Sequence, residues 1–148
     1  MRTRTVSRLP IVLVLAAVAC GRGDDAATTD TANPPATANA AVRVTEVTVG
    51  NAIGADKRVT AAMDELRPSD TIYVSVATEG SASNAQLTAR WTFEDGQVVD
   101  ETSQTISPTG PAVTEFHISN PAGWPPGDYE VEILLDGASA ERKSFSIR

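Results

Sequence analysis

GDYEVEILLDG, residues 127–137, decides the fold class of this chain. Tyr129, Val131 and Ile133 alternate with acidic residues, which is the pattern of a strand with one face in a core and the other in water. Asp136-Gly137 then marks a turn. A half-buried strand must cover its apolar face with a second layer, so the stretch predicts a layered β-structure.

The same alternation recurs along residues 42–148, and turn residues rich in Pro, Gly and Asp separate the runs. Only Thr60–Leu66 has a pattern that allows a helical turn. Short strands at this spacing are typical of an all-β antiparallel sandwich, here of about seven strands. The alternating runs are 42–49, 72–77, 87–93, 112–118, 129–135 and 145–147.

Two positions carry register information. The apolar phase slips between Val44 and Val47, which predicts a β-bulge or a switch between sheets. The last two strands must keep Val131 and Phe145 on one face, and a two-residue loop breaks that parity. We therefore expect a loop of three or five residues there, with Gly137 at positive φ.

The N-terminus has the pattern of a secretory signal. Arg2, Arg4 and Arg8 precede an apolar run, Leu9–Ala19, that ends at the single Cys, Cys20. A run of about eleven residues is too short for a membrane-spanning helix, which needs roughly 20. Residues 1–19 are thus expected to be a signal peptide that is removed.

Ala17-Val18-Ala19-Cys20 resembles the lipobox of bacterial lipoproteins, with Ala17 where that family most often has Leu. The resemblance implies that Cys20 receives a diacylglycerol and becomes the first residue, so that the lipid holds the chain on a membrane. Gly21, in place of an Asp, favours the outer membrane facing the periplasm over the inner membrane or the cell surface. The alternative is ordinary cleavage that leaves Cys20 as a free thiol.

Residues 20–41 are predicted to be a lipidated Cys and a disordered tether, because Gly21–Ala41 contains no aromatic residue and no Val, Ile, Leu or Met. Residues 42–148 form the folded domain. Residues 20–148 contain nineteen acidic and nine basic side chains, which argues against a nucleic-acid partner. One Cys and one His exclude an intrachain disulfide and a His/Cys zinc cluster within one chain.

The domain resembles immunoglobulin-like domains at two places. Trp91 lies on the third strand, where such domains bury a Trp, and Gly127–Val131 is similar to their tyrosine corner. The resemblance implies an Ig-like sandwich without a disulfide. In it, Val74 and Val131 take the places of the two cysteines of antibody domains.

Candidate chemistry is sparse. His117 alternates with apolar neighbours and is expected on a solvent face, with no nucleophile elbow near it in the sequence. Asp128, Glu130 and Glu132 form an acidic row on one face of a strand, which lacks the loop pattern of a calcium site. We expect Arg90 and Arg142 to pair with this row. No catalytic residue, metal site or cofactor is predicted, and the chain is not expected to be an enzyme.

Trp124 is the one candidate contact residue. It lies in the stiff loop Asn120–Gly127, which either presents the indole to an envelope protein partner or lets it fold down to plug one end of the sandwich. The plug is the slightly favoured interpretation.

The function class expected is a lipid-anchored, non-enzymatic interaction or structural module of the cell envelope. The alternative is a small ligand-binding or protease-inhibitor-like protein on an Ig-like fold, such as the chagasin type. The N-P-T-T-G and G-x-G-G loops of that type are missing here.

Overall fold

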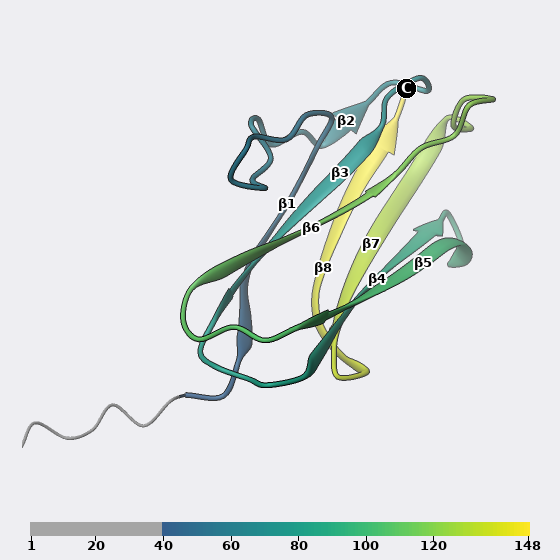
Figure 1. Cartoon of the computed structure of the whole chain (residues 1–148). Helices are drawn as coiled ribbons and strands as arrows, with labels where there is room; N and C mark the ends of the chain where they lie inside the picture. The colour runs from purple at the N-terminus through teal and green to yellow at the C-terminus, as the bar shows by residue number, and fades with distance from the viewer. Residues whose placement is uncertain (1–39) are drawn as a thin grey trace, which may run out of the picture. The chain divides into compact units, whose positions relative to one another are not determined.

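Alternating apolar residues give two sheets that pack face to face in the computed structural model, which describes residues 40–148 (Figure 1). One sheet has the strand order β1-β3-β6, and the other has the order β2-β8-β7-β4-β5. The expected signal peptide, residues 1–19, and Cys20 lie outside the described residues. The eight strands are β1 Arg43–Gly50, β2 Glu65–Leu66, β3 Ile72–Glu79, β4 Ala85–Phe93, β5 Gln97–Ile106, β6 Ala112–Ile118, β7 Gly127–Leu135 and β8 Ala138–Ile147.

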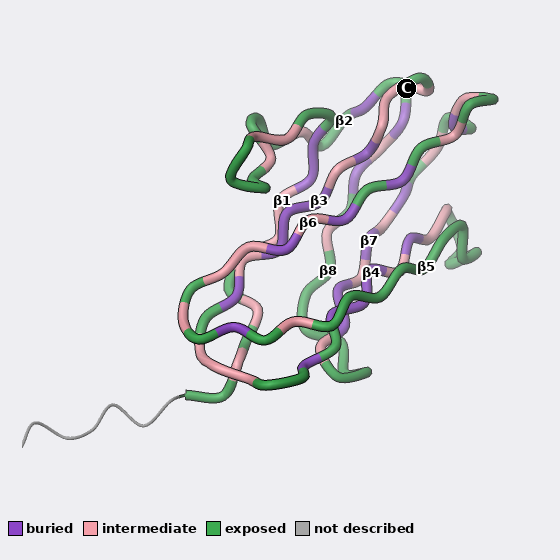
Figure 2. The backbone as a smooth tube through the Cα atoms, in the orientation of Figure 1, coloured by how far each residue is buried: buried purple, intermediate pink, exposed green. Residues whose placement is uncertain are grey.

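The core is built of apolar side chains from strands of both sheets, and Figure 2 shows the buried residues recurring along these strands. Val74 of β3 and Val131 of β7, which the resemblance to antibody domains predicts at the cysteine positions, are both fully buried. Since each fully buried aliphatic side chain contributes about 1.5–3 kcal/mol, this double layer accounts for folding without a disulfide. The largest fully buried side chains include Trp91, Phe116, Leu66, Ile72, Leu87, Ile133 and Ile147.

Trp91 occupies the core position that the Ig resemblance predicts. Its side chain is only 1% exposed and meets Phe145 edge-on, with ring centroids 6.2 Å apart. The indole N–H has no hydrogen-bond acceptor within the described part of the chain. Trp91 therefore stabilises the core through its packing alone.

The predicted tyrosine corner is present at the start of β7. The hydroxyl of Tyr129 donates a hydrogen bond of 2.8 Å to the carbonyl of Pro125, four residues earlier. Its ring stacks on Phe145 at 5.6 Å and meets Trp124 edge-on at 6.3 Å. Burial raises the pKa of Tyr129, and the nearby carboxylate of Glu94 adds to the shift. Tyr129 thus joins the loop before β7 to the core.

The predicted bulge in β1 is confirmed. The β1–β3 register shifts between Val44 and Glu46. Val44 stands opposite Thr78 and Val47 stands opposite Val76, so both valines face the core on either side of the bulge. The phase slip in the sequence is a bulge and not a switch between sheets.

The loop length predicted for the last hairpin is wrong. Asp136-Gly137 is a two-residue loop between Leu135 and Ala138, and the parity is restored by a bulge between Ile133 and Leu134. Asp136 and Gly137 both have positive φ, at 51° and 81°, as a tight hairpin turn requires. The expected positive φ at Gly137 is confirmed. Val131 and Phe145 do share one face, as predicted, but a bulge and not a longer loop achieves this.

The helical turn that the pattern of Thr60–Leu66 allows does not form. The segment bends at Thr60, Ala61 and Asp64 and ends in β2, where Glu65 and Leu66 pair in parallel with Ser146 and Ile147 of β8. Burial of Leu66, which is 1% exposed, outweighs the local pattern. Within residues 40–148, no helix is long and apolar enough to cross a membrane.

Residues 40 and 41, the end of the predicted tether, are described and contact the loop after β3, whereas residues 20–39 of that tether lie outside the described residues. The backbone N–H of Ser81 donates to the carbonyl of Ala40, and Ala41 forms a bridge with Ser81. Gly80 has φ of +98°, and a Cβ there would lie 2.5 Å from the carbonyl oxygen of Ala41. Only glycine therefore fits where residues 40–41 cross the loop after β3.

We predict that Trp91→Ala lowers the free energy of unfolding by roughly 3–5 kcal/mol, because it opens a cavity in the centre of the core. Trp91→Phe is the matched control. It keeps an aromatic ring and removes an unpaired buried donor, so it costs less. Urea denaturation of the two variants measures both values. A Trp91→Ala variant as stable as wild type would contradict the packing described here.

Candidate functional site

Trp124 is buried, and this settles where its side chain lies. It is 8% exposed, and its indole N–H donates to the carbonyl of Asp70 at 3.0 Å. Its backbone N–H donates to the carbonyl of Pro68 at 2.8 Å. Trp124 therefore plugs one end of the sandwich and joins the loop before β7 to the loop before β3. The interpretation of Trp124 as an exposed contact residue is wrong, because its indole N–H is already hydrogen-bonded and most of its surface is buried in the domain.

The turn before Trp124 holds itself in shape. The side-chain amide of Asn120 donates to the carbonyl of Gly123 at 2.7 Å, and its side-chain oxygen accepts the N–H of Ala122 at 3.1 Å. Gly123 has φ of +86°, in the left-handed region that favours glycine. These bonds, together with two prolines after Trp124, direct the indole inward.

His117 lies on the solvent side of β6, as predicted. Its side chain is 57% exposed, and Nδ1 lies 2.6 Å from a carboxylate oxygen of Glu115. Its ring packs on Tyr73, with centroids 5.5 Å apart. These contacts of His117 are with a carboxylate and an aromatic ring of the same surface, and neither is a Ser, Thr or Cys.

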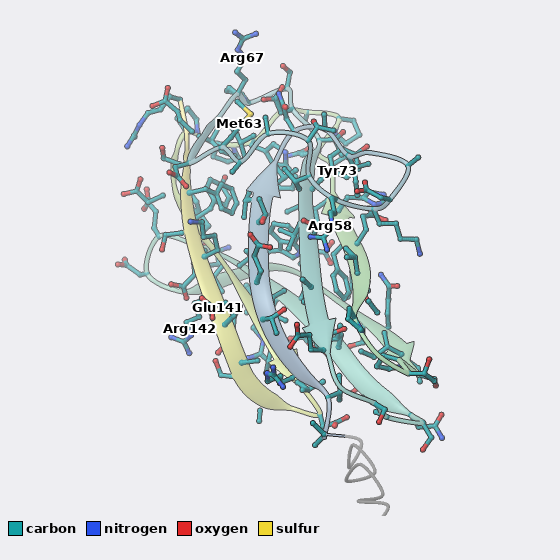
Figure 3. All side chains as sticks on the ribbon, turned by 90° about the vertical axis from the view of Figure 1, so that its left-hand side faces the viewer. Arg58, Met63, Arg67, Tyr73, Glu141 and Arg142 are labelled. Atoms are coloured by element: carbon teal, nitrogen blue, oxygen red, sulfur yellow. The ribbon has the colours of Figure 1, made fainter. Side chains whose placement is uncertain are left out.

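The acidic row on β7 is paired with arginines, as expected. Glu132 lies 2.7 Å from Arg142 of β8 and 3.5 Å from Arg90 of β4. Glu130 is 3.9 Å from Arg142, and Asp128 is 3.3 Å from Arg148. Figure 3 shows Arg142 on β8, beside Glu141 and facing away from the sandwich. The row forms a cross-strand ion-pair network on the outer face of the larger sheet.

Glu132 is the centre of this network. Its side chain is 13% exposed, far less than that of Arg142 at 60%. A hydrogen bond from Ser139, followed by those from Arg142, lowers the pKa of Glu132 from its usual value. Hydrogen bonds to Glu132 in turn raise the pKa of Arg142. Glu132 therefore stays ionised in the folded state and ties β4, β7 and β8 together on their outer side.

A shallow hollow opens at one end of the same face. It has a volume of about 430 Å³ and is lined by Asp64, Glu94, Asp128, Glu130 and Arg148, with Tyr129 and Phe145 among the residues beneath. Small-molecule sites are usually lined by apolar side chains with a few polar groups. The lining of this hollow is instead mostly charged and polar. In residues 40–148, no group of three or more His, Cys, Asp or Glu side chains is arranged to hold a metal ion.

The fold occurs in a solved structure. An immunoglobulin-like protein from Pseudomonas aeruginosa matches 75% of this chain and 99% of its own, with a TM-score of 0.53 and 16% sequence identity. The domain is an immunoglobulin-like β-sandwich. At this identity the likeness shows the fold alone, and it is the fold that Trp91 and the tyrosine corner predict.

Two weaker likenesses are to domains of larger proteins. One is the alkylpurine DNA glycosylase AlkC of Pseudomonas fluorescens, with a TM-score of 0.48, 16% identity and cover of 72% of this chain and 30% of that chain. The other is a β-glucosidase of saponin metabolism from intestinal bacteria, with a TM-score of 0.47, 14% identity and cover of 72% and 16%. No protein-family model and no curated protein matches this chain.

Sequence reasoning missed one feature of the surface, the strand β5. Residues 97–106 form a ten-residue edge strand that is exposed along nearly its whole length (Figure 2). Because neither face is buried, its sequence has no apolar alternation. The available signals were Asp95-Gly96, which precedes it as a hairpin turn, and the adjacent β-branched residues Val98 and Val99.

We predict that Trp124→Ala lowers the free energy of unfolding by about 3 kcal/mol, because it empties the end of the core. The melting temperature then falls by roughly 10 °C or more. Trp124→Phe keeps the packing and loses the hydrogen bond to Asp70, at a cost of about 1 kcal/mol. Thermal unfolding followed by circular dichroism measures both changes. Unchanged melting of Trp124→Ala would show that the indole does not serve as a plug.

We predict that Glu132→Gln destabilises the domain at pH 7 by about 1 kcal/mol, through lost charge-assisted hydrogen bonds. The folded-state pKa of Glu132 is lowered, so its contribution is complete above the usual value of 4.5 and is lost as the pH falls through the folded-state pKa. The difference between wild type and variant should therefore shrink below pH 4.5.

Chemical denaturation between pH 7 and pH 3 measures that difference. Glu130→Gln is the control, because its carboxylate lies 3.9 Å from Arg142 and is 39% exposed. A deficit for Glu132→Gln that stays constant across this range would contradict the electrostatic origin.

Proposed function

We infer that the chain is a lipid-anchored protein of the cell envelope whose Ig-like domain is a non-enzymatic interaction or structural module. The observation that carries the proposal is Cys20. It is the single Cys of 148 residues, and it stands directly after a basic segment and the short apolar run Leu9–Ala19. Its place on the outer membrane, facing the periplasm, rests on Gly21 and belongs to the proposal.

The domain supports a binding role more than a catalytic one. Two side chains capable of general acid or base chemistry are already engaged in surface pairs, His117 with Glu115 and Glu132 with Arg142. A catalytic site needs a nucleophile, a base and an orienting group that converge on a pocket. The hollow beside Asp128 offers carboxylates and Arg148 on an open surface. A rigid sandwich held by Tyr129 and Trp124 is well suited to presenting a surface.

A small ligand-binding or inhibitor protein is the second candidate. The hollow of about 430 Å³ is the observation in its favour, since its volume falls in the range of ligand sites. Its charged lining and open shape rank this candidate below an interaction module.

Mass spectrometry of the N-terminal peptide from membrane-extracted protein tests the anchor. We predict that the peptide begins at Cys20 and carries the mass of acyl chains. A Cys20→Ala variant is the control, and it should lose both the modification and membrane association. An unmodified Cys20, or a retained Met1, would overturn the proposed anchor.

Affinity capture from detergent-solubilised envelope, with the full chain as bait, tests the interaction role. The proposal expects a protein that wild type retains in stoichiometric amount. Turnover of a substrate by the purified chain would contradict it.

A further inference from the structure

β5, at ten residues, is the longest edge strand of the described domain. β5 ends the order of the five-stranded sheet, and its contacts with other strands are mainly with β4. All its residues except Ile106 are exposed, and Figure 2 shows this as a green tube along one side. An antiparallel strand directs every second pair of backbone N–H and C=O groups away from its neighbour. About half of the backbone groups of β5 therefore face water in a row.

This edge has only some of the devices by which sheets block further pairing, namely a bulge at Val99 and the charges of Asp100 and Glu101. Residues 97–106 contain no Pro, Lys, Arg or Gly. The large hydrophobic side chains exposed on the described domain are Val98, at 55%, and Val99, at 41%, and both lie here. The bulge interrupts β5 at Val99, which has no partner on β4, and regular pairing with β4 runs from Asp100 to Ile106. A long, regular and partly apolar edge is a template for another strand.

The negative charge around β5 determines which kind of strand can pair with its free edge. No Lys or Arg occurs between Arg90 and Arg142, a stretch that holds ten acidic residues. On β5, Glu101 is paired with Arg90 at 2.6 Å, whereas within residues 40–148 the carboxylate of Asp100 accepts a hydrogen bond only from the N–H of Glu101. Glu94 and Asp95 add two more acids at the adjoining turn. An incoming strand with acidic side chains is repelled, and one with basic side chains is attracted.

We propose that the β5 edge binds an extended, cationic segment of a partner polypeptide by strand addition. This rests on the proposed interaction function and names its surface. Backbone hydrogen bonds would supply affinity, Asp100 would pair with a basic side chain, and Val98 and Val99 would contact β-branched residues.

Charge disfavours the two other occupants. A second copy would bring an equally acidic β5 against this one. The chain's own segment Gly21–Ala41 contains three Asp, one Arg and two Pro. Its net charge is negative, and its prolines cannot donate the backbone hydrogen bonds of an added strand. The cationic partner is the occupant that the edge favours.

Hydrogen–deuterium exchange of the full chain in non-ionic detergent tests this proposal. The probe is a ten-residue capped peptide in which lysine alternates with valine and threonine, and the control peptide has glutamate in place of lysine. The lysine peptide should slow exchange of about every second amide in residues 97–106 by about tenfold or more. Higher salt should weaken this protection. Equal protection by both peptides, or protection away from β5, would overturn the proposal.

Two proline variants separate strand addition from surface attraction. Neighbouring residues on an antiparallel strand direct their N–H groups to opposite sides. One of Thr102→Pro and Ser103→Pro therefore breaks a backbone bond to β4 and lowers the melting temperature, while the other removes a free N–H. Because Ser103→Pro also removes the hydroxyl that bonds Thr88 at 2.7 Å, Ser103→Ala is its control. The variant that keeps the wild-type melting temperature should lose the probe-dependent protection. If it binds the lysine peptide as wild type does, strand addition is wrong.

Asp100→Lys reverses a charge that pairs with no basic side chain in the described domain, and it should weaken binding of the lysine peptide about fivefold or more. Glu46→Lys, on β1 in the other sheet, is the matched control and should leave binding unchanged.

An acylated Cys20 with no protection of β5 would overturn this inference and leave the proposed anchor intact. A protected β5 with an unmodified Cys20 would support this inference and overturn the proposed anchor.

Discussion

The register of β7 with its two neighbours is the constraint on which the rest of the domain depends. Trp91 of β4 stands opposite Val131, and Phe145 of β8 stands opposite Tyr129. Because side chains alternate between faces, a shift of one residue in either pairing would put this whole apolar set in water. At about 1.5–3 kcal/mol for each side chain, the loss would be as large as the usual net stability of a small domain, which is about 5–15 kcal/mol. The two-residue hairpin loop at Asp136 is compatible with this register because the bulge between Ile133 and Leu134 returns the apolar side chains of β7 and β8 to the same face.

Side chains on the outer face secure the same register. Glu132 reaches Arg90 on one neighbouring strand and Arg142 on the other, so the ion pairs repeat the pairing that the core imposes. At the end of the sandwich, Tyr129 and Trp124 hold the preceding loop through bonds to the carbonyls of Pro125 and Asp70. Core, outer face and loop thus agree on one arrangement, which is the property that gives a sequence a unique fold.

The sequence was sufficient wherever one face of a strand is buried. The core strands, the burial of Trp91, the bulge near Val44 and the tyrosine corner follow from alternation and from two short resemblances. β5 was missed because an edge strand exposed on both faces has no alternation to detect. β2 was missed because two residues hold it, through long-range pairing with β8. The candidate site was less predictable. Whether Trp124 points in or out depends on an acceptor, Asp70, that lies 54 residues away.

The way residues 40–41 cross the end of the domain has a mechanical consequence. Ala40 and Ala41 are fastened to Ser81, and the chain then runs straight into β1, which pairs along its length with β3. A pull on the N-terminus therefore acts along the axis of β1. The hydrogen bonds to β3 lie across that axis and carry the load together, in shear, so they do not open one after another. A domain of this geometry resists being stretched from its N-terminal side.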